Sequence, residues 1–246
     1  MAAVMRSTSN IARQTTPFGA GQRPFGKDRP ILATLAMGWT GDVHLPAWAC
    51  AVYLTTVSTR TLSLDGRHLN FGFEVLSRQE PDSQTEIVHR LDNILVACRR
   101  QAKTLAGHNL DPDLARLASF ASDQRRLPGV DTVRQHWANR SVKGRGTARM
   151  LDTAHDLGQA QETDLIATCD RVALKSGSIA APDGRASPAD MARRALTRTL
   201  AIALIAARAA GRYDWTSPID LDELVLSAAW DQFDELATAP PSVPAP

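Results

Sequence analysis

Cysteine is scarce in this chain, and the few cysteines are widely separated. Three occur in 246 residues, at Cys50, Cys98 and Cys169, and none belongs to a CxxC pair. An odd and scattered set argues against a zinc site and is typical of reduced thiols in a cytosol-like compartment. We therefore expect a cytoplasmic protein.

Long apolar runs and a strong net charge are also missing. The most apolar stretch, LAIALIAARAA, is interrupted by Arg208 and is shorter than the ~20 residues that a membrane span requires. We therefore expect no membrane partner. The formal net charge of +2 tolerates a nucleic-acid partner without demanding one. With 43% hydrophobic and 22% charged residues, the composition is that of an ordinary globular protein.

The two ends of the chain lack the apolar residues that a core needs. Residues 1–30 are rich in Ser, Thr, Gly, Pro and Arg, with no acid before Asp28, which predicts a flexible N-terminal arm. An acid-poor start with Arg and Ser is also typical of an organelle transit peptide, but the Gly and Pro of PFGAGQRPFG oppose an amphipathic helix. Residues 239–246 are predicted to form a Pro-rich tail.

The first half of the chain between these ends has strand periodicity. The runs PILATLAM and AWACAVYLTTVSTRTLSL predict two strands, and Asp65-Gly66 predicts a hairpin turn into a third strand at residues 69–75, where apolar and polar residues alternate. Together these strands form an antiparallel meander. A capping box at Ser83 and Glu86 then predicts a helix over IVHRLDNILVACRRQAKTL.

Further strands and helices follow in alternation, which indicates a mixed α/β plan. TLAGHN predicts a fourth strand and TARMLDTAHDLG a fifth strand or a strand–helix junction, while Asp111-Pro112 starts a helix and ETDLIATCDRVAL forms a short one. Ser187 and Ser217 are each followed by Pro and, two residues later, by Asp, so each is expected to cap a helix. The second of these, in residues 213–238, is acidic and amphipathic and could dock on the domain itself or on a partner protein.

The segment LAGHNLDPDLARL, with the elements on both sides of it, resembles the proofreading-type 3′–5′ exonucleases of the ribonuclease-H-like DEDD superfamily. In that family a meander, a helix, a strand ending in Gly-His-Asn and a helix bearing a catalytic aspartate follow in this order. The resemblance covers about residues 31–212. It implies an α/β fold with a ribonuclease-H-like mixed sheet, a three-strand antiparallel meander plus parallel strands, flanked by helices. It also makes Asp113 the catalytic and metal-binding aspartate.

The chemistry of that family requires more acids than this sequence provides. Two Mg²⁺ ions about 4 Å apart activate a water, and such hard cations need several converging carboxylates. The family carries Asp-x-Glu on the first strand, before a Thr-Gly turn; here Thr40 and Gly41 match the turn, but Ala36 and Gly38 replace the acids. In the last helix, the resemblance puts Arg193 and Arg198 where the family has a His and, five positions later, an Asp.

Three aspartates are the candidate catalytic residues: Asp113, Asp42 and Asp190. Asp42 follows the Thr-Gly turn and could reach the site if the first strand is shifted, although a surface loop also explains it. Asp190 and Asp113 each have an alternative role, because an acid in the first turn of a helix complements the helix dipole. If the protein is active it needs Mg²⁺; otherwise Asp113 pairs with Arg193 or Arg198 in a metal-free pocket.

Basic residues near an aromatic suggest contact with single-stranded DNA or RNA, by phosphate neutralisation and base stacking. They are concentrated in RQHWANRSVKGRGTARM, for which a solvated basic loop is the alternative, and His108 and Asn109 also serve as turn residues. The candidate nucleic-acid-binding residues are His108, Asn109, Trp137, Arg140, Lys143, Arg145, Arg193 and Arg198.

Two functions of different class follow. One is a divergent 3′–5′ exonuclease with a degenerate metal site, acting on the ends of single strands. The other is a non-catalytic module of the same fold that binds nucleic acid or a protein. The missing acids favour the second as biochemistry, because fold alone does not determine function.

Overall fold

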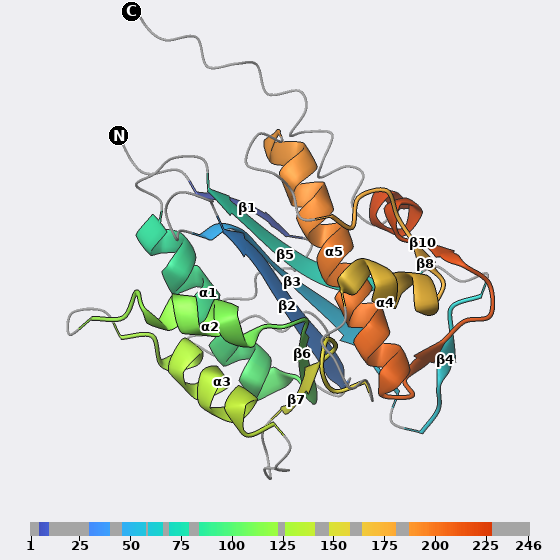
Figure 1. The fold of residues 1–246 in the computed structure, drawn as a ribbon, viewed down its shortest axis with the longest axis horizontal. Helices are drawn as coiled ribbons and strands as arrows, with labels where there is room; N and C mark the ends of the chain where they lie inside the picture. Colours follow the sequence, from blue (N-terminus) through green and yellow to red (C-terminus); the bar gives the residue numbers. More distant parts are fainter. Residues whose placement is uncertain are drawn as a thin grey trace, which may run out of the picture.

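A mixed β-sheet between two layers of helices forms the centre of the protein in a computed structural model (Figure 1). The structure describes residues 5–9, 30–39, 46–57, 59–65, 69–78, 84–122, 126–140, 148–157, 164–180 and 187–227. The sheet has six strands in the order β1-β5-β3-β2-β6-β7. They are β1 (Met5–Ser9), β2 (Ile31–Trp39), β3 (Pro46–Thr55), β5 (Phe71–Arg78), β6 (Thr104–Gly107) and β7 (Arg149–Asp152).

The direction of each strand follows the predicted plan. β2, β3 and β5 form the antiparallel meander, whereas β6 runs parallel to β2 and β7 runs parallel to β6. The prediction of a mixed α/β sheet flanked by helices is therefore confirmed. β2 is buried on both faces, which explains why ILATLAM is a continuous apolar run and does not alternate.

Helices cover both faces of the sheet (Figure 1). One face carries α1 (Gln84–Gln101), α2 (Asp111–Ala118) and α3 (Pro128–Ala138). The other carries α5 (Pro188–Ala209), with α4 (Leu165–Arg171) packed against it. Buried residues of α1 recur every three or four positions, at Ile87, Leu91, Leu95 and Cys98, as the sequence predicts. Within the described ranges, no helix has both the length and the hydropathy needed to cross a lipid bilayer.

Two hydrophobic cores result, one on each face of the sheet. Side chains of β2 alternate between them: Leu32 and Ala36 face α5, while Ile31 and Leu35 face α1. α5 contributes five fully buried alanines to the first core: Ala195, Ala201, Ala203, Ala206 and Ala207. Small side chains let α5 lie close against β2 and β3.

The segment after α5 forms two short parallel strand pairs outside the six-stranded sheet. β9 (Tyr213–Asp214) pairs with β4 (Leu62–Ser63), and β10 (Ile219–Asp220) pairs with β8 (Leu174–Lys175). The Tyr213 hydroxyl donates to the carbonyl of Thr55 at 2.6 Å. Helical residues 221–227 follow, and Leu221 and Val225 lie in the same core as α5. The described part of the predicted C-terminal helix therefore packs on its own domain, and a protein partner for it stays a prediction.

Three local predictions differ from the structure. Within the predicted N-terminal arm, β1 pairs antiparallel with β5 at the edge of the sheet. The second strand ends at Thr55, the short strand before Asp65 pairs with β9, and Asp65 accepts the backbone N–H groups of Thr216 and Ser217, while Gly66 of the predicted turn lies outside the described residues. Ser187 caps α5 as expected, whereas the last helix is capped by Asp220 and not by Ser217.

Candidate functional site

The candidate site lies where the parallel strands β2 and β6 end and α2 begins. Open α/β sheets commonly bind ligands at the carboxyl ends of their strands. Trp39 is the last residue of β2, and Asp113 belongs to the first turn of α2. The site is therefore built by one strand end, one helix start and the neighbouring face of α5.

The Gly-His-Asn turn before α2 is fixed by contacts to the end of β7. Asn109 has a left-handed backbone (φ 51°), and its N–H donates to the carboxylate of Asp152 at 2.9 Å. The Nδ1 atom of His108 lies 3.0 Å from the hydroxyl of Thr153, whose own N–H donates to the carbonyl of Gly107. These contacts explain His108 and Asn109 as turn residues, and their predicted contact with nucleic acid stays a prediction.

Gly107 is required by close packing in this turn. A Cβ atom built at Gly107 lies 2.9 Å from the Cβ atom of Leu110 and 3.2 Å from the ring of Trp137. Asp152, which is 1% exposed, also accepts the N–H of Ala154. The motif that prompted the family resemblance thus has a complete structural role in this protein.

Asp113 is held by an indole. The Nε1 atom of Trp39 donates to Oδ1 of Asp113 at 2.7 Å, and the guanidinium of Arg116 lies over the Trp39 ring, 5.5 Å from its centroid. Arg116 is one helical turn after Asp113, so the three side chains form one cluster. This cluster, Trp39, Asp113 and Arg116, is called the Trp39 cluster below.

Burial determines the protonation behaviour of Asp113. Burial raises the pKa of this carboxyl, and the Trp39 hydrogen bond and the positive charges of Arg116 and Arg198 only partly offset the rise. The buried carboxyl therefore holds its proton more tightly than an exposed aspartate does.

Arg198 is a half-buried cation near Asp164, Cys169 and Asp113. Burial lowers the pKa of its guanidinium, while the charges of Asp164, Cys169 and Asp113 act to raise it. Its Nη1 atom donates to the carbonyl of Ile179 at 3.2 Å. Arg198 therefore places positive charge near Asp113.

The predicted ion pair of Asp113 is not among the described contacts, although the charge of Arg198 acts on this carboxyl. Arg193 pairs instead with Asp190 at 2.6 Å, one turn away on α5. Asp190 also receives the Ser187 hydroxyl, so it acts as a cap residue at the helix start. Its predicted catalytic role is unsupported by this geometry, and among the described contacts Asp113 forms a direct ion pair with neither Arg193 nor Arg198.

The two positions where the family has acids on the first strand are closed by packing. Ala36 is 6% exposed and lies in the core that faces α5. A Cβ atom at Gly38 lies 2.2 Å from Nε1 of Trp48 and 2.5 Å from its Cε2 atom, so the Trp48 ring occupies the space of a side chain at position 38. An acid at Gly38 cannot be accommodated unless Trp48 moves.

The described residues contain no cluster of side chains that could bind a metal ion. No three His, Cys, Asp or Glu side chains gather there in a way that could hold a metal ion. The third candidate, Asp42, lies outside the described residues. The Mg²⁺ expected for an active enzyme therefore rests on the resemblance alone.

The prediction that Trp137 of the basic segment stacks on bases is wrong. Trp137 is fully buried against Val130 and Val133, in the core that faces α1. Arg140 is half-buried and pairs with Asp156 at 3.0 Å. Lys143 and Arg145 lie outside the described residues.

Two residues of the site, Trp39 and Arg116, are absent from the predicted set. Their signal in the sequence is weak but present. Trp39 directly precedes the Thr-Gly turn at the end of an apolar strand, and Arg116 follows Asp113 at helical spacing. The sequence does not indicate that an indole from one strand reaches a carboxylate 74 positions away.

No protein-family model, curated protein or solved structure matches this chain.

Proposed function

We propose that the protein is a non-catalytic relative of the ribonuclease-H-like 3′–5′ exonucleases, and that the surface around the Trp39 cluster binds the ends of single-stranded nucleic acid. Support for the family comes from the order of the strands, a meander followed by two parallel strands, together with the Gly-His-Asn segment. The fold does not determine the activity, so the surroundings of Asp113 carry the functional argument.

The hydrogen bond from Trp39 to Asp113 is the main observation behind the proposed absence of catalysis. This bond takes up one acceptor position of Asp113, and the packing at Ala36 and Gly38 leaves no space on β2 for the acids that would complete a metal site. The guanidinium of Arg198 adds positive charge nearby, and positive charges at close range repel a second cation. Metal-dependent hydrolysis needs the opposite charge distribution.

The same positive charge favours a phosphate. Arg116 is exposed and stacked on Trp39, and Arg193 and Arg194 of α5 are half-exposed toward the amino end of that helix. Guanidinium groups bind phosphate through paired N–H donors, and an indole edge can contact a terminal base. Binding therefore needs no metal.

A binding and cleavage assay tests the proposal. A short 5′-labelled single strand is titrated into the full chain with fluorescence anisotropy, at several salt concentrations and with Mg²⁺ or Mn²⁺. We expect salt-dependent binding without cleavage, and Arg116→Gln should weaken it and reduce the slope of log K against log salt by about 1.

Arg60→Gln is the matched control, because Arg60 is exposed and follows β3 at the opposite end of the sheet from Trp39. It removes the same charge and should leave binding nearly unchanged. Metal-dependent cleavage that Asp113→Ala abolishes would show a working nuclease and overturn the proposal. Binding that falls equally with Arg116→Gln and Arg60→Gln would show only a diffuse attraction between opposite charges.

A further inference from the structure

β1 is attached to the rest of the molecule along one strand only. It pairs antiparallel with β5 over its whole length, from Met5 opposite Arg78 to Ser9 opposite Glu74. Among the described elements, β5 is the only one with which β1 makes extensive contact, and Figure 1 shows β1 at the outer edge of the sheet. Detaching β1 would therefore break one ladder of backbone hydrogen bonds and leave the pairing of the other five strands intact.

β5 requires a neighbouring strand on this edge. Residues 71–77 are buried, and they include Phe73 and Val75 on one face of the sheet and Leu76 on the other. Without β1, the backbone N–H and C=O groups of β5 would form an open edge beside apolar side chains, and such an edge pairs readily with a strand from another chain. The outer edge of β5 is therefore a strand-binding site, which β1 fills in this structure.

The chain that follows β1 is long enough to reach a second molecule. Residues 10–30 connect β1 to β2, and in the sheet Ser9 lies level with Leu35 of β2, three strands away. The end of β1 is therefore only about 20 Å from the start of β2. A chain of this length can span up to about 70 Å. The same β1 can accordingly pair with β5 of its own molecule or with β5 of a neighbouring one.

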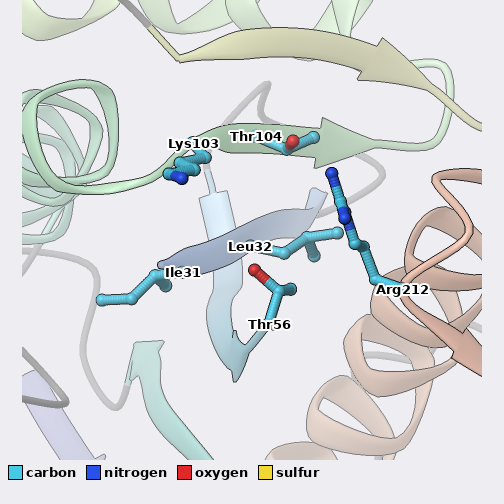
Figure 2. A pocket seen from close by; sticks show the side chains of 6 residues that line it. All are labelled: Ile31, Leu32, Thr56, Lys103, Thr104 and Arg212. Carbon is cyan, nitrogen blue, oxygen red and sulfur yellow. The ribbon is translucent and has the colours of Figure 1, made fainter. Parts of the chain in front are cut away.

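The start of β2 is anchored independently of β1. The N–H of Thr56 donates to the carbonyl of Pro30 at 2.8 Å, and the N–H of Lys103 donates to the carbonyl of Ile31 at 2.8 Å. Figure 2 shows Ile31 and Thr56 at this end of the sheet, around a small pocket. These bonds hold β2 between its neighbours, so β1 can change its partner while β2 stays in place.

We propose that β1 is exchanged between two copies of this chain, so that β1 of each copy pairs with β5 of the other. The contact is the one that the structure shows within the molecule, so exchange creates no new interface and changes only which molecule supplies the strand. A tethered strand competes at an effective concentration on the order of millimolar, so exchange should increase with protein concentration. This inference does not depend on the function proposed for the Trp39 cluster.

Disulfide trapping in the full chain tests the exchange. Directly opposed residues of an antiparallel pair have Cα atoms about 4.5–5.5 Å apart, which a disulfide can bridge. Arg6 is opposite Ser77, so one population carries Arg6→Cys and the other carries Ser77→Cys. The two are mixed at about 1 mM, near the effective concentration of a tethered strand, and oxidised. Mass spectrometry measures the disulfide between position 6 of one chain and position 77 of another. The three native cysteines are buried and compete little.

Arg60→Cys mixed with Ser77→Cys is the matched control, because Arg60 is exposed and lies outside the strands of the sheet. We expect the disulfide between positions 6 and 77 to form about tenfold or more in excess of the disulfide between positions 60 and 77. Its yield should also rise with protein concentration. Equal yields in the two mixtures would show only random collisions of thiols and would overturn the inference.

A chain that carries both Arg6→Cys and Ser77→Cys separates pairing from exchange. Oxidised in dilute solution, it should close the disulfide within one molecule and then remain monomeric when concentrated, because β1 is locked. Closure in this variant without any transfer between the mixed single variants means that β1 stays with its own β5, and it overturns the inference. Failure of the double variant to close overturns it as well, because β1 would then not pair with β5 in solution.

Discussion

The indole of Trp39 donates its N–H to Asp113 across 2.7 Å, and this contact joins the end of a buried strand to the start of a helix. The carboxylate is therefore part of the packing between β2 and α2. Replacing the indole tests how much of that packing depends on the bond. Trp39→Phe keeps an aromatic ring but removes the donor, so we expect a loss of about 1.5–3 kcal/mol in the free energy of unfolding. Urea denaturation measures it, and an unchanged midpoint would show that the bond contributes nothing.

Asp113→Asn should stabilise the protein at neutral pH. Burial raises the pKa of Asp113, so the folded state holds this proton more tightly than the unfolded state does. Its contribution to stability is full below the unfolded pKa of about 3.9 and is lost as pH rises through the folded pKa. The amide keeps the acceptor oxygen for Trp39 but carries no charge. Urea unfolding between pH 4 and 8 should show a gain that grows with pH.

The control for that experiment is Asp111→Asn, an exposed acid of the same helix, which should change stability little. Destabilisation by Asp113→Asn at neutral pH would mean that Arg116 and Arg198 attract the carboxylate more strongly than burial disfavours it. A gain in stability on adding Mg²⁺ that is lost in Asp113→Asn would indicate bound metal instead.

Gly38→Ala should lower stability by about 1–3 kcal/mol, because the new methyl group overlaps the Trp48 ring. Trp48→Leu removes the ring and opens space. The double variant should therefore lose less than the sum of the two single variants. Additive losses would show that the ring moves away freely, and then an acid at position 38 could also be accommodated.

The ion pair between Glu74 and Arg90 is another partly buried charge contact, 2.6 Å long, with the Glu74 side chain only 7% exposed. Arg90→Ala leaves that carboxylate without its partner, so we expect a loss of about 3 kcal/mol. Replacing both residues with Met should restore most of the stability. Equal losses in the single and double variants would contradict this account.

The thiols of Cys50 and Cys98 should resist alkylation in the folded protein. Burial raises the pKa of each to about 12, so at pH 8 only about one in ten thousand is a thiolate. Mass spectrometry after iodoacetamide treatment should find both unmodified in buffer and fully modified in urea. Rapid labelling of either in buffer would reveal local opening of the sheet.

The periodicity of apolar residues predicts most of the helices and strands. The elements that it does not predict depend on contacts between distant parts of the chain. The meander, α1, β6 and α5 follow from local pattern and capping. The prediction that Trp137 stacks on bases rests on its basic neighbours, whereas its spacing from Val130 and Val133 is that of one buried helix face. β4 and β9 are only two residues each and exist because distant segments meet, which no local pattern indicates.

The candidate site was less predictable than the fold. Asp113 and Arg198 are brought near each other, as the resemblance suggested, and their charges interact. The hydrogen bond that decides the role of Asp113 comes from Trp39, and the closure of position 38 comes from Trp48. Both depend on side-chain direction at a strand end, where the β2–β3 register shifts between Gly38 and Trp39.

The return of the chain after α5 has a practical consequence for truncation. Trp215 donates its indole N–H to the carbonyl of Val172 at 2.7 Å, and Asp65 binds the backbone of the same segment. A fragment ending at residue 212 would uncover Leu64 and Leu174 and remove the partners of both short strands. Protein engineers who want a minimal soluble fragment should therefore keep the chain through at least residue 227.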